Sequence, residues 1–97
     1  MALYPILDTA DGDTGDTRTK GSGREAGLFH CELASGDVVE IETIGRDGGT
    51  WKSMAAFNLP TDPPYLLDPL PRQYRARRST DGGVGDSLVD VEIYPER

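Results

Sequence analysis

Hydrophobic and polar residues alternate along several short stretches of this 97-residue chain, as they do in half-buried β-strands. The clearest stretches are residues 28–33, 38–44, 51–57, 74–78 and 88–94. Many of their residues are β-branched or aromatic, which suits the pleated surface of a sheet. The pattern predicts an all-β fold: about seven short strands forming a small antiparallel β-sandwich of the immunoglobulin-like or jelly-roll-like type.

Two hairpins are predicted from glycine-rich turns between such stretches. Asp47-Gly48-Gly49 supplies the positive-φ residues of a tight reversal, so residues 37–57 are expected to form one hairpin. Residues 81–86 are expected to join 74–78 to 88–94 in a second hairpin. In that hairpin Arg75 and Arg77 would lie opposite Asp90 and Glu92, as paired surface charge rather than an anion-binding patch that also includes Arg72 and Arg78.

Alternation also predicts which side chains face the core, because successive residues of a strand point to opposite faces. In 51–57 the pattern places Trp51, Ser53, Ala55 and Phe57 on one face and Lys52, Met54 and Ala56 on the other, and leaves open which face is buried; Trp51 and Phe57 give the first face the larger apolar area. The other inward positions are Phe29, Cys31, Leu33, Val39, Ile41, Thr43, Tyr74, Ala76, Val89, Val91 and Ile93.

Residues 1–27 are predicted to be an extended N-terminal arm, with the β-sandwich domain spanning 28–97. Pro5 interrupts the apolar run at residues 2–7, which confines that run to an edge strand or to an arm on a neighbouring subunit. Residues 8–27 are polar and lack any apolar period. Residues 58–71, with five of the seven prolines, are expected to form an ordered crossover. The expected partner interface comprises Leu3, Tyr4, Ile6, Leu7, Tyr65 and Leu66.

Composition narrows the functional classes. Apolar residues make up 36% of the chain, so the core is expected to be small and association with a partner or with further copies would add stability. A formal charge of −7 disfavours binding to nucleic acid or anionic lipid. The sequence shows no signal peptide and no run of membrane-spanning length, so synthesis and folding in a cytosol are expected.

No catalytic, cofactor or metal constellation is predicted. The carboxylates at Asp8, Asp11, Asp13 and Asp16 do not match a calcium loop, because the glycine and glutamate positions counted from Asp11 are Asp16 and Ser22. His30 and Cys31 are single residues of their type and are interpreted as structural. The glycine-rich segments 21–24 and 82–85 lack the ending of a phosphate-binding loop. Trp51 and Tyr65 remain a possible sugar-stacking platform.

Four segments carry a resemblance to a known class of protein. They are Gly36-Asp37-Val38-Val39-Glu40-Ile41, Asp47-Gly48-Gly49-Thr50-Trp51, Pro71-Arg72-Gln73-Tyr74-Arg75-Ala76-Arg77 and Val89-Asp90-Val91-Glu92-Ile93-Tyr94. In this order, the segments between residues 28 and 94 resemble the strands of small β-sandwich accessory proteins from tailed-phage virions. The same strand pattern also occurs in immunoglobulin-like and fibronectin-like modules.

The resemblance implies a non-enzymatic structural role as a capsid decoration (cement) protein or another head or tail accessory. The implied partners are the major capsid protein or other virion subunits, with homo-oligomers expected and the virion as the final location. A carbohydrate- or host-surface-binding module of the tail is the alternative. A small hydrolase or metal protein is the third possibility and has no constellation to support it.

Overall fold

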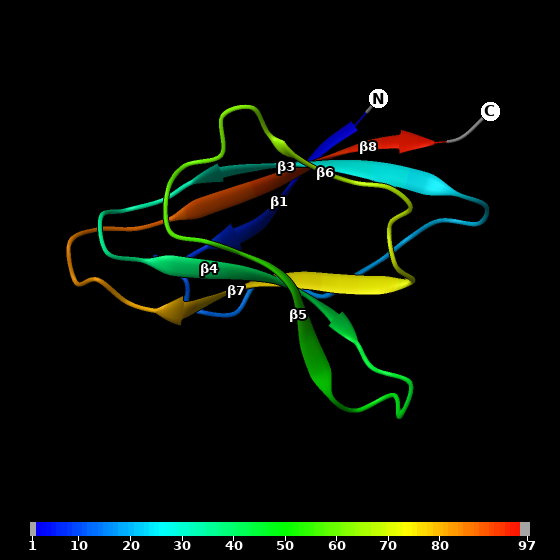
Figure 1. Ribbon diagram of the computed structural model, residues 1–97, viewed down its shortest axis with the longest axis horizontal. Coiled ribbons are helices and arrows are strands. Elements are labelled where there is room, and N and C mark those ends of the chain that lie inside the picture. Colours follow the sequence, from blue (N-terminus) through cyan, green and yellow to red (C-terminus); the bar gives the residue numbers. More distant parts are fainter. Residues whose placement is uncertain (1, 96–97) are drawn as a thin grey trace.

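Two four-stranded antiparallel sheets face each other in a computed structural model that describes residues 2–95 (Figure 1). The first sheet has the order β1 (Ala2–Asp8), β8 (Leu88–Pro95), β3 (Glu25–Glu32) and β6 (Tyr65–Leu67). The second has the order β2 (Arg18–Thr19), β7 (Gln73–Thr80), β4 (Val38–Ile44) and β5 (Trp51–Phe57). The predicted all-β sandwich is confirmed, with eight strands. No helix that could cross a membrane occurs in residues 2–95.

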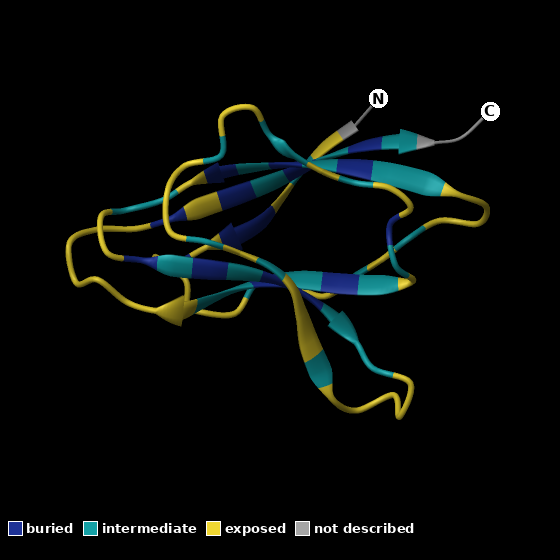
Figure 2. Cartoon of the chain, in the orientation of Figure 1, coloured by how far each residue is buried: buried dark blue, intermediate teal, exposed yellow. Residues whose placement is uncertain are grey.

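The core lies between the two sheets and is built from the inward positions of alternating strands. Figure 2 shows buried residues concentrated on the strands, with exposed residues in the loops. The ring of Phe29 lies 5.9 Å from that of Tyr74 on the opposite sheet, centroid to centroid, in an edge-to-face arrangement. Most of the predicted inward positions are confirmed; the fully or almost fully buried ones are Phe29, Cys31, Val39, Ile41, Tyr74, Ala76, Val89, Val91 and Ile93.

The N-terminal segment differs from the predicted arm, because β1, β2 and the start of β3 lie within it and belong to the sheets. β1 pairs with β8, so the edge-strand interpretation of residues 2–7 holds within this chain. A register shift between Pro5 and Leu7 turns both Ile6 and Leu7 into the core, where each is less than 5% exposed. The boundary placed after residue 27 falls inside β3, which begins at Glu25. The N-terminal strand is therefore part of the sandwich.

Residues 9–20 close one side of the sandwich by passing from β1 to the edge of β7. The Gly15 amide donates to the Ala76 carbonyl, and Arg18 and Thr19 pair with Tyr74 and Gln73. A Cβ atom at Gly15 would lie 1.8 Å from the carbonyl oxygen of Ile6, so only glycine fits between the two sheets at this point. The sequence has no apolar period here, so it did not predict that this segment is ordered. Main-chain hydrogen bonds to the neighbouring strand hold it in place.

The predicted C-terminal hairpin is wrong. β7 and β8 belong to different sheets, and residues 81–87 carry the chain from one sheet to the other. Arg75 and Arg77 therefore lie opposite Glu42 and Glu40 of β4, and the predicted partners on β8 are on the other sheet. The arginines are paired surface charges, as expected, but with carboxylates that alternation alone could not identify.

The hairpin of β4 and β5 is confirmed, and its tip projects away from the two sheets (Figure 1). Ile41 pairs with Ala55 and Glu42 pairs with Ser53, so Met54 is an extra residue that forms a bulge in β5. The bulge puts Trp51 on the outer face with Glu42, whereas Phe57 packs against the core. The prediction that Trp51 and Phe57 share one face is wrong for this reason.

Candidate functional site

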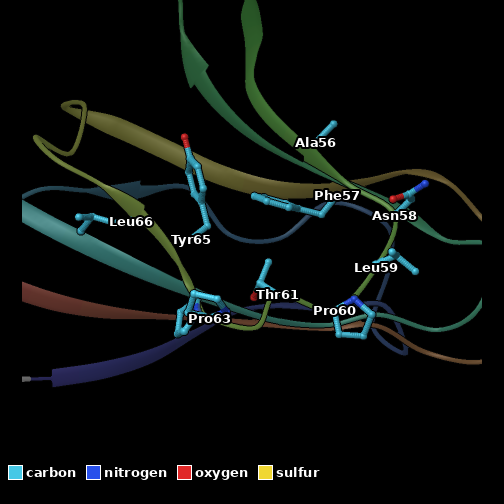
Figure 3. Close-up of a pocket in the computed structure, with 10 residues that line it drawn as sticks. Ala56, Phe57, Asn58, Leu59, Pro60, Thr61, Pro63, Tyr65 and Leu66 are labelled. Carbon is cyan, nitrogen blue, oxygen red and sulfur yellow. The ribbon is translucent and has the colours of Figure 1, made fainter.

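Figure 3 shows a pocket of about 430 Å³. By the strand order, it lies at the edge of the sandwich opposite β1 and β2, the strands that residues 9–20 connect. It lies between β5, the edge strand of one sheet, and β6, the edge strand of the other. The loop at residues 58–64 connects these strands and forms part of the wall. The pocket is lined by Ala56, Phe57, Asn58, Leu59, Pro60, Thr61, Pro63, Pro64, Tyr65 and Leu66, none of which is charged.

The loop of the pocket is anchored to β3 through one residue. The Thr61 amide donates to the Cys31 carbonyl over 3.2 Å, and the Cys31 amide donates to Thr61 Oγ1 over 2.9 Å. The same hydroxyl donates to the Phe29 carbonyl over 3.2 Å. The proline rings at positions 60, 63 and 64 fix their own φ angles and restrict the residues before them. The loop is therefore a rigid wall, and the pocket exists before any ligand binds.

Two aromatic rings connect the pocket to the core. The rings of Phe57 and Tyr65 lie 5.2 Å apart, centroid to centroid, at an interplanar angle of 63°. Tyr65 in turn lies 6.3 Å from the ring of Phe29. Leu59 and Leu66 are 71% and 56% exposed at the mouth of the pocket. Figure 3 shows the Phe57 and Tyr65 side chains converging, with Leu66 extending away from them.

Leu66 also belongs to a row of residues that crosses the outer face of the first sheet. The cross-strand pairs Leu3 with Glu92, Glu92 with Leu28, and Leu28 with Leu66 place these four residues side by side. Leu3 is 59% exposed and Leu28 is half-buried. We call the pocket and this row together the β6 surface.

Carboxylates dominate the charge of the β6 surface. The Nε2 atom of His30 lies 3.1 Å from Glu92, and the hydrogen bond from His30 is the main reason that the pKa of Glu92 lies below its usual range. Asp90 and Glu32 lie on the same face of the sheet as Glu92 and His30, because the pairs His30 with Asp90 and Glu32 with Leu88 are in register. Asp62 is the one charged residue in the sequence of the loop at 58–64. The rim is acidic around an uncharged pocket.

The six residues predicted as a partner interface are divided by the structure. Tyr65 and Leu66 lie together at the pocket, whereas Leu3 lies at the opposite edge of the first sheet, with β8 and β3 between β1 and β6. Ile6 and Leu7 lie in the core, which excludes them from an interface of the folded domain. The remaining residue, Tyr4, packs against the core and under the guanidinium of Arg18, which lies 3.9 Å from the ring centroid. Leu59 was missed because a lone leucine between polar and proline residues gives no periodic signal.

Trp51 and Tyr65 do not form one platform. Tyr65 contacts Phe57 at the end of β5, whereas Trp51 begins that strand on the outer face of the second sheet. The guanidinium of Arg75 lies 4.1 Å from the centroid of the Trp51 ring and covers one of its faces. Arg75 also donates to buried Glu42 over 2.9 Å, so this stack is fixed by an ion pair.

A buried polar cluster at the end of the sandwich was also missed. Asp37 is fully buried and accepts hydrogen bonds from Ser87 Oγ at 2.6 Å, the Gly82 amide at 2.7 Å and Arg78 at 3.3 Å. Ser87 is the largest of the causes that hold the pKa of Asp37 below its usual range. Arg78 also pairs with Asp13 and Asp81. The cluster links the connections between β1 and β2, between β3 and β4, and between β7 and β8, and it stabilises that end of the fold.

The acidic run at residues 8–16 and the single cysteine were the residues considered for metal binding or nucleophilic chemistry. Among residues 2–95 no three histidine, cysteine, aspartate or glutamate side chains are grouped to hold a metal ion. Asp13 of the N-terminal acidic run is instead paired with Arg78. Cys31 is buried, and burial raises the pKa of its thiol to about 11, so the reactive thiolate is scarce at neutral pH.

Comparison with known proteins gives no match: no protein-family model, curated protein or solved structure matches this chain.

Proposed function

We propose that this chain is a non-enzymatic structural protein of a phage virion that binds the particle surface as a decoration or cement protein. The observation that carries the proposal is the β6 surface, where Leu59, Leu66 and Leu3 are exposed on one part of the domain. Isolated exposed leucines are common on proteins, whereas exposed leucines beside a pocket are typical of an interaction site; Leu59 and Leu66 lie at the pocket, and Leu3 lies beyond Glu92 in the same row.

The occupant of this surface is taken to be a virion subunit for two reasons. The strand order from residue 28 to 94 resembles that of virion accessory proteins. In addition, the carboxylates around the β6 surface fit a protein surface with a basic rim, and opposite potentials favour both encounter and correct register. Phosphate-rich polymers are repelled by the same carboxylates and by the net charge of −7.

Many copies on a symmetric particle would make a modest interface sufficient. A shell presents the same binding site many times, so a decoration protein that also associates with its own copies gains avidity without a large contact area. The rigid sandwich supports this role because its interface needs little ordering on binding, which reduces the entropic cost.

The carbohydrate-binding alternative lacks a comparable observation. Stacking on a sugar requires an accessible aromatic face, and one face of the Trp51 ring is covered by Arg75. Tyr65 is packed against Phe57 and Phe29.

The experiment is a compositional analysis of virions purified from the phage whose genome encodes this chain. Quantitative mass spectrometry is expected to find the protein at a fixed ratio to the major capsid protein in every preparation. Two results would contradict the proposal: absence of the protein from purified particles, or a ratio of this protein to the major capsid protein that falls with each purification step even when the sample is diluted little.

A further inference from the structure

The pocket between β5 and β6 has room for a side chain from another molecule. Its volume of about 430 Å³ far exceeds the roughly 30 Å³ that one water molecule occupies in the liquid. Among the described residues its lining is uncharged, and the hydroxyl of Thr61 is already engaged with Phe29 and Cys31. The apolar part of the lining comes from Phe57, Leu59 and Leu66, and an apolar side chain of the ligand would gain free energy by covering them.

The main chain around the pocket favours an extended ligand. β5 is the outer strand of its sheet, so its free edge presents unpaired N–H and C=O groups within the described structure. The bulge at Met54 interrupts that edge and leaves residues 55–57 as the regular part next to the pocket. On the other wall, the prolines at 60, 63 and 64 have no N–H to donate. β6, the edge strand on the same wall, has only the three residues Tyr65–Leu67, so strand pairing at this site is short on either strand.

The charges around the pocket favour cations in the ligand. Asp62 is exposed in the loop, and Glu32 is exposed on β3 next to Cys31, the residue that holds Thr61. The lysine of β5, Lys52, lies four positions before Ala56, or roughly 13 Å away along an extended strand. The one charged residue in the loop that forms the pocket wall is thus negative.

We infer that the pocket binds an extended, basic segment of the partner subunit, which inserts one large apolar side chain between Phe57 and Leu59 and pairs its main chain with residues 55–57. This inference rests on the proposed function and specifies the chemistry of the partner. The apolar anchor supplies most of the affinity, the short strand pairing fixes the direction of the segment, and the cations steer it toward Asp62.

The test uses the full chain, labelled with nitrogen-15, and a short peptide of sequence KRVWVRK observed by nuclear magnetic resonance. Binding with a Kd on the order of 1 mM or tighter is expected, with shifts concentrated at residues 55–66. Replacing the peptide tryptophan with serine, or its basic residues with glutamate, is expected to weaken binding roughly tenfold or more. Raising the salt concentration should also weaken it.

Matched variants of the protein make the result specific. Leu59→Ser should reduce the affinity roughly tenfold or more, whereas Val84→Ser, at a position with the same 71% exposure in the loop at 81–87, should leave it unchanged. Shifts centred elsewhere, equal binding of the acidic peptide, or no binding at millimolar concentration would each overturn the inference.

The two proposals fail separately. A protein that is present in virions at a fixed ratio but does not bind the basic peptide retains the structural role and loses the inferred partner chemistry. A protein that binds the peptide in this pocket but is absent from virions retains a peptide-binding site and loses the virion role.

Discussion

The carboxylate of Asp37 accepts a 2.6 Å hydrogen bond from Ser87 Oγ, although the two residues are 50 positions apart in the sequence and both are fully buried. Asp37 precedes β4 of one sheet and Ser87 precedes β8 of the other. The bond therefore joins the two layers at one end of the sandwich, and Arg78 adds a charge-assisted contact to the same carboxylate.

This relationship predicts acid sensitivity. The folded-state pKa of Asp37 is lowered, so its contribution to stability is fully present above the unfolded-state pKa, near 3.8, and is lost as the pH falls through the folded-state value. Urea unfolding at pH 7 and pH 3 should show a loss of stability in acid. In the Asp37→Asn variant, stability at pH 7 should be lower and the difference between the two pH values smaller. An unchanged pH dependence in that variant would contradict the role of this carboxylate.

The tight contact at Gly15 predicts a steric cost. Gly15→Ala should lower the free energy of unfolding by about 1–3 kcal/mol, because the new methyl group would overlap the backbone of Ile6 and force the strands apart. Gly49→Ala is the control, since a Cβ there meets no atom within 4 Å. Equal denaturation midpoints for the two variants would show that residues 9–20 do not close the sandwich as described.

The stack of Arg75 on Trp51 predicts a change in fluorescence. Arg75→Ala should expose the indole of the single tryptophan and shift its emission to longer wavelength, while loss of the charged hydrogen bond to Glu42 should cost about 1.5–3 kcal/mol of stability. Exposed Arg72 provides the control, where alanine should change stability by no more than about 0.5 kcal/mol. An emission maximum identical to that of the wild type would refute the stack.

The packing of β1 predicts that the N-terminal strand is essential for folding. Ile6→Ala should destabilise the domain by about 2–5 kcal/mol, because Ile6 is buried in the core. Leu3→Ala, three positions earlier in the same strand and exposed, should change stability by no more than about 0.5 kcal/mol. A folded domain of undiminished stability after deletion of residues 1–26 would instead support an independent arm.

The strands themselves were predictable, because their residues alternate strongly and their turns contain glycine. The pairing of the strands was less predictable. From the local sequence, residues 74–78 and 88–94 could form either a hairpin or strands of two different sheets. The hydrogen bonds of buried Asp37 to Gly82 and Ser87 are among the contacts that hold the connection between them in its path from one sheet to the other. Long-range contacts of this kind leave no periodic signal in the sequence.

The candidate site was predictable only in part. Leu3 and Leu66 were predicted as interface residues, but their placement in one row depends on the strand order β1-β8-β3-β6. Ile6 and Leu7 looked equally suited to an interface, and the irregular pairing beside Pro5 is what directs both into the core. The bulge at Met54 likewise separated Trp51 from Phe57. In each case a local irregularity overrode simple alternation.

The central claim is that the β6 surface attaches this protein to a particle. The most direct measurement is the binding of purified variants to virions assembled without the protein, followed by sedimentation. The wild type and the Val84→Ser variant are expected to sediment with the particles. The Leu66→Ser and Leu59→Ser variants, which like Val84→Ser are changed at exposed positions, are expected to remain in the supernatant. Equal occupancy of the particle by all four proteins would contradict the account.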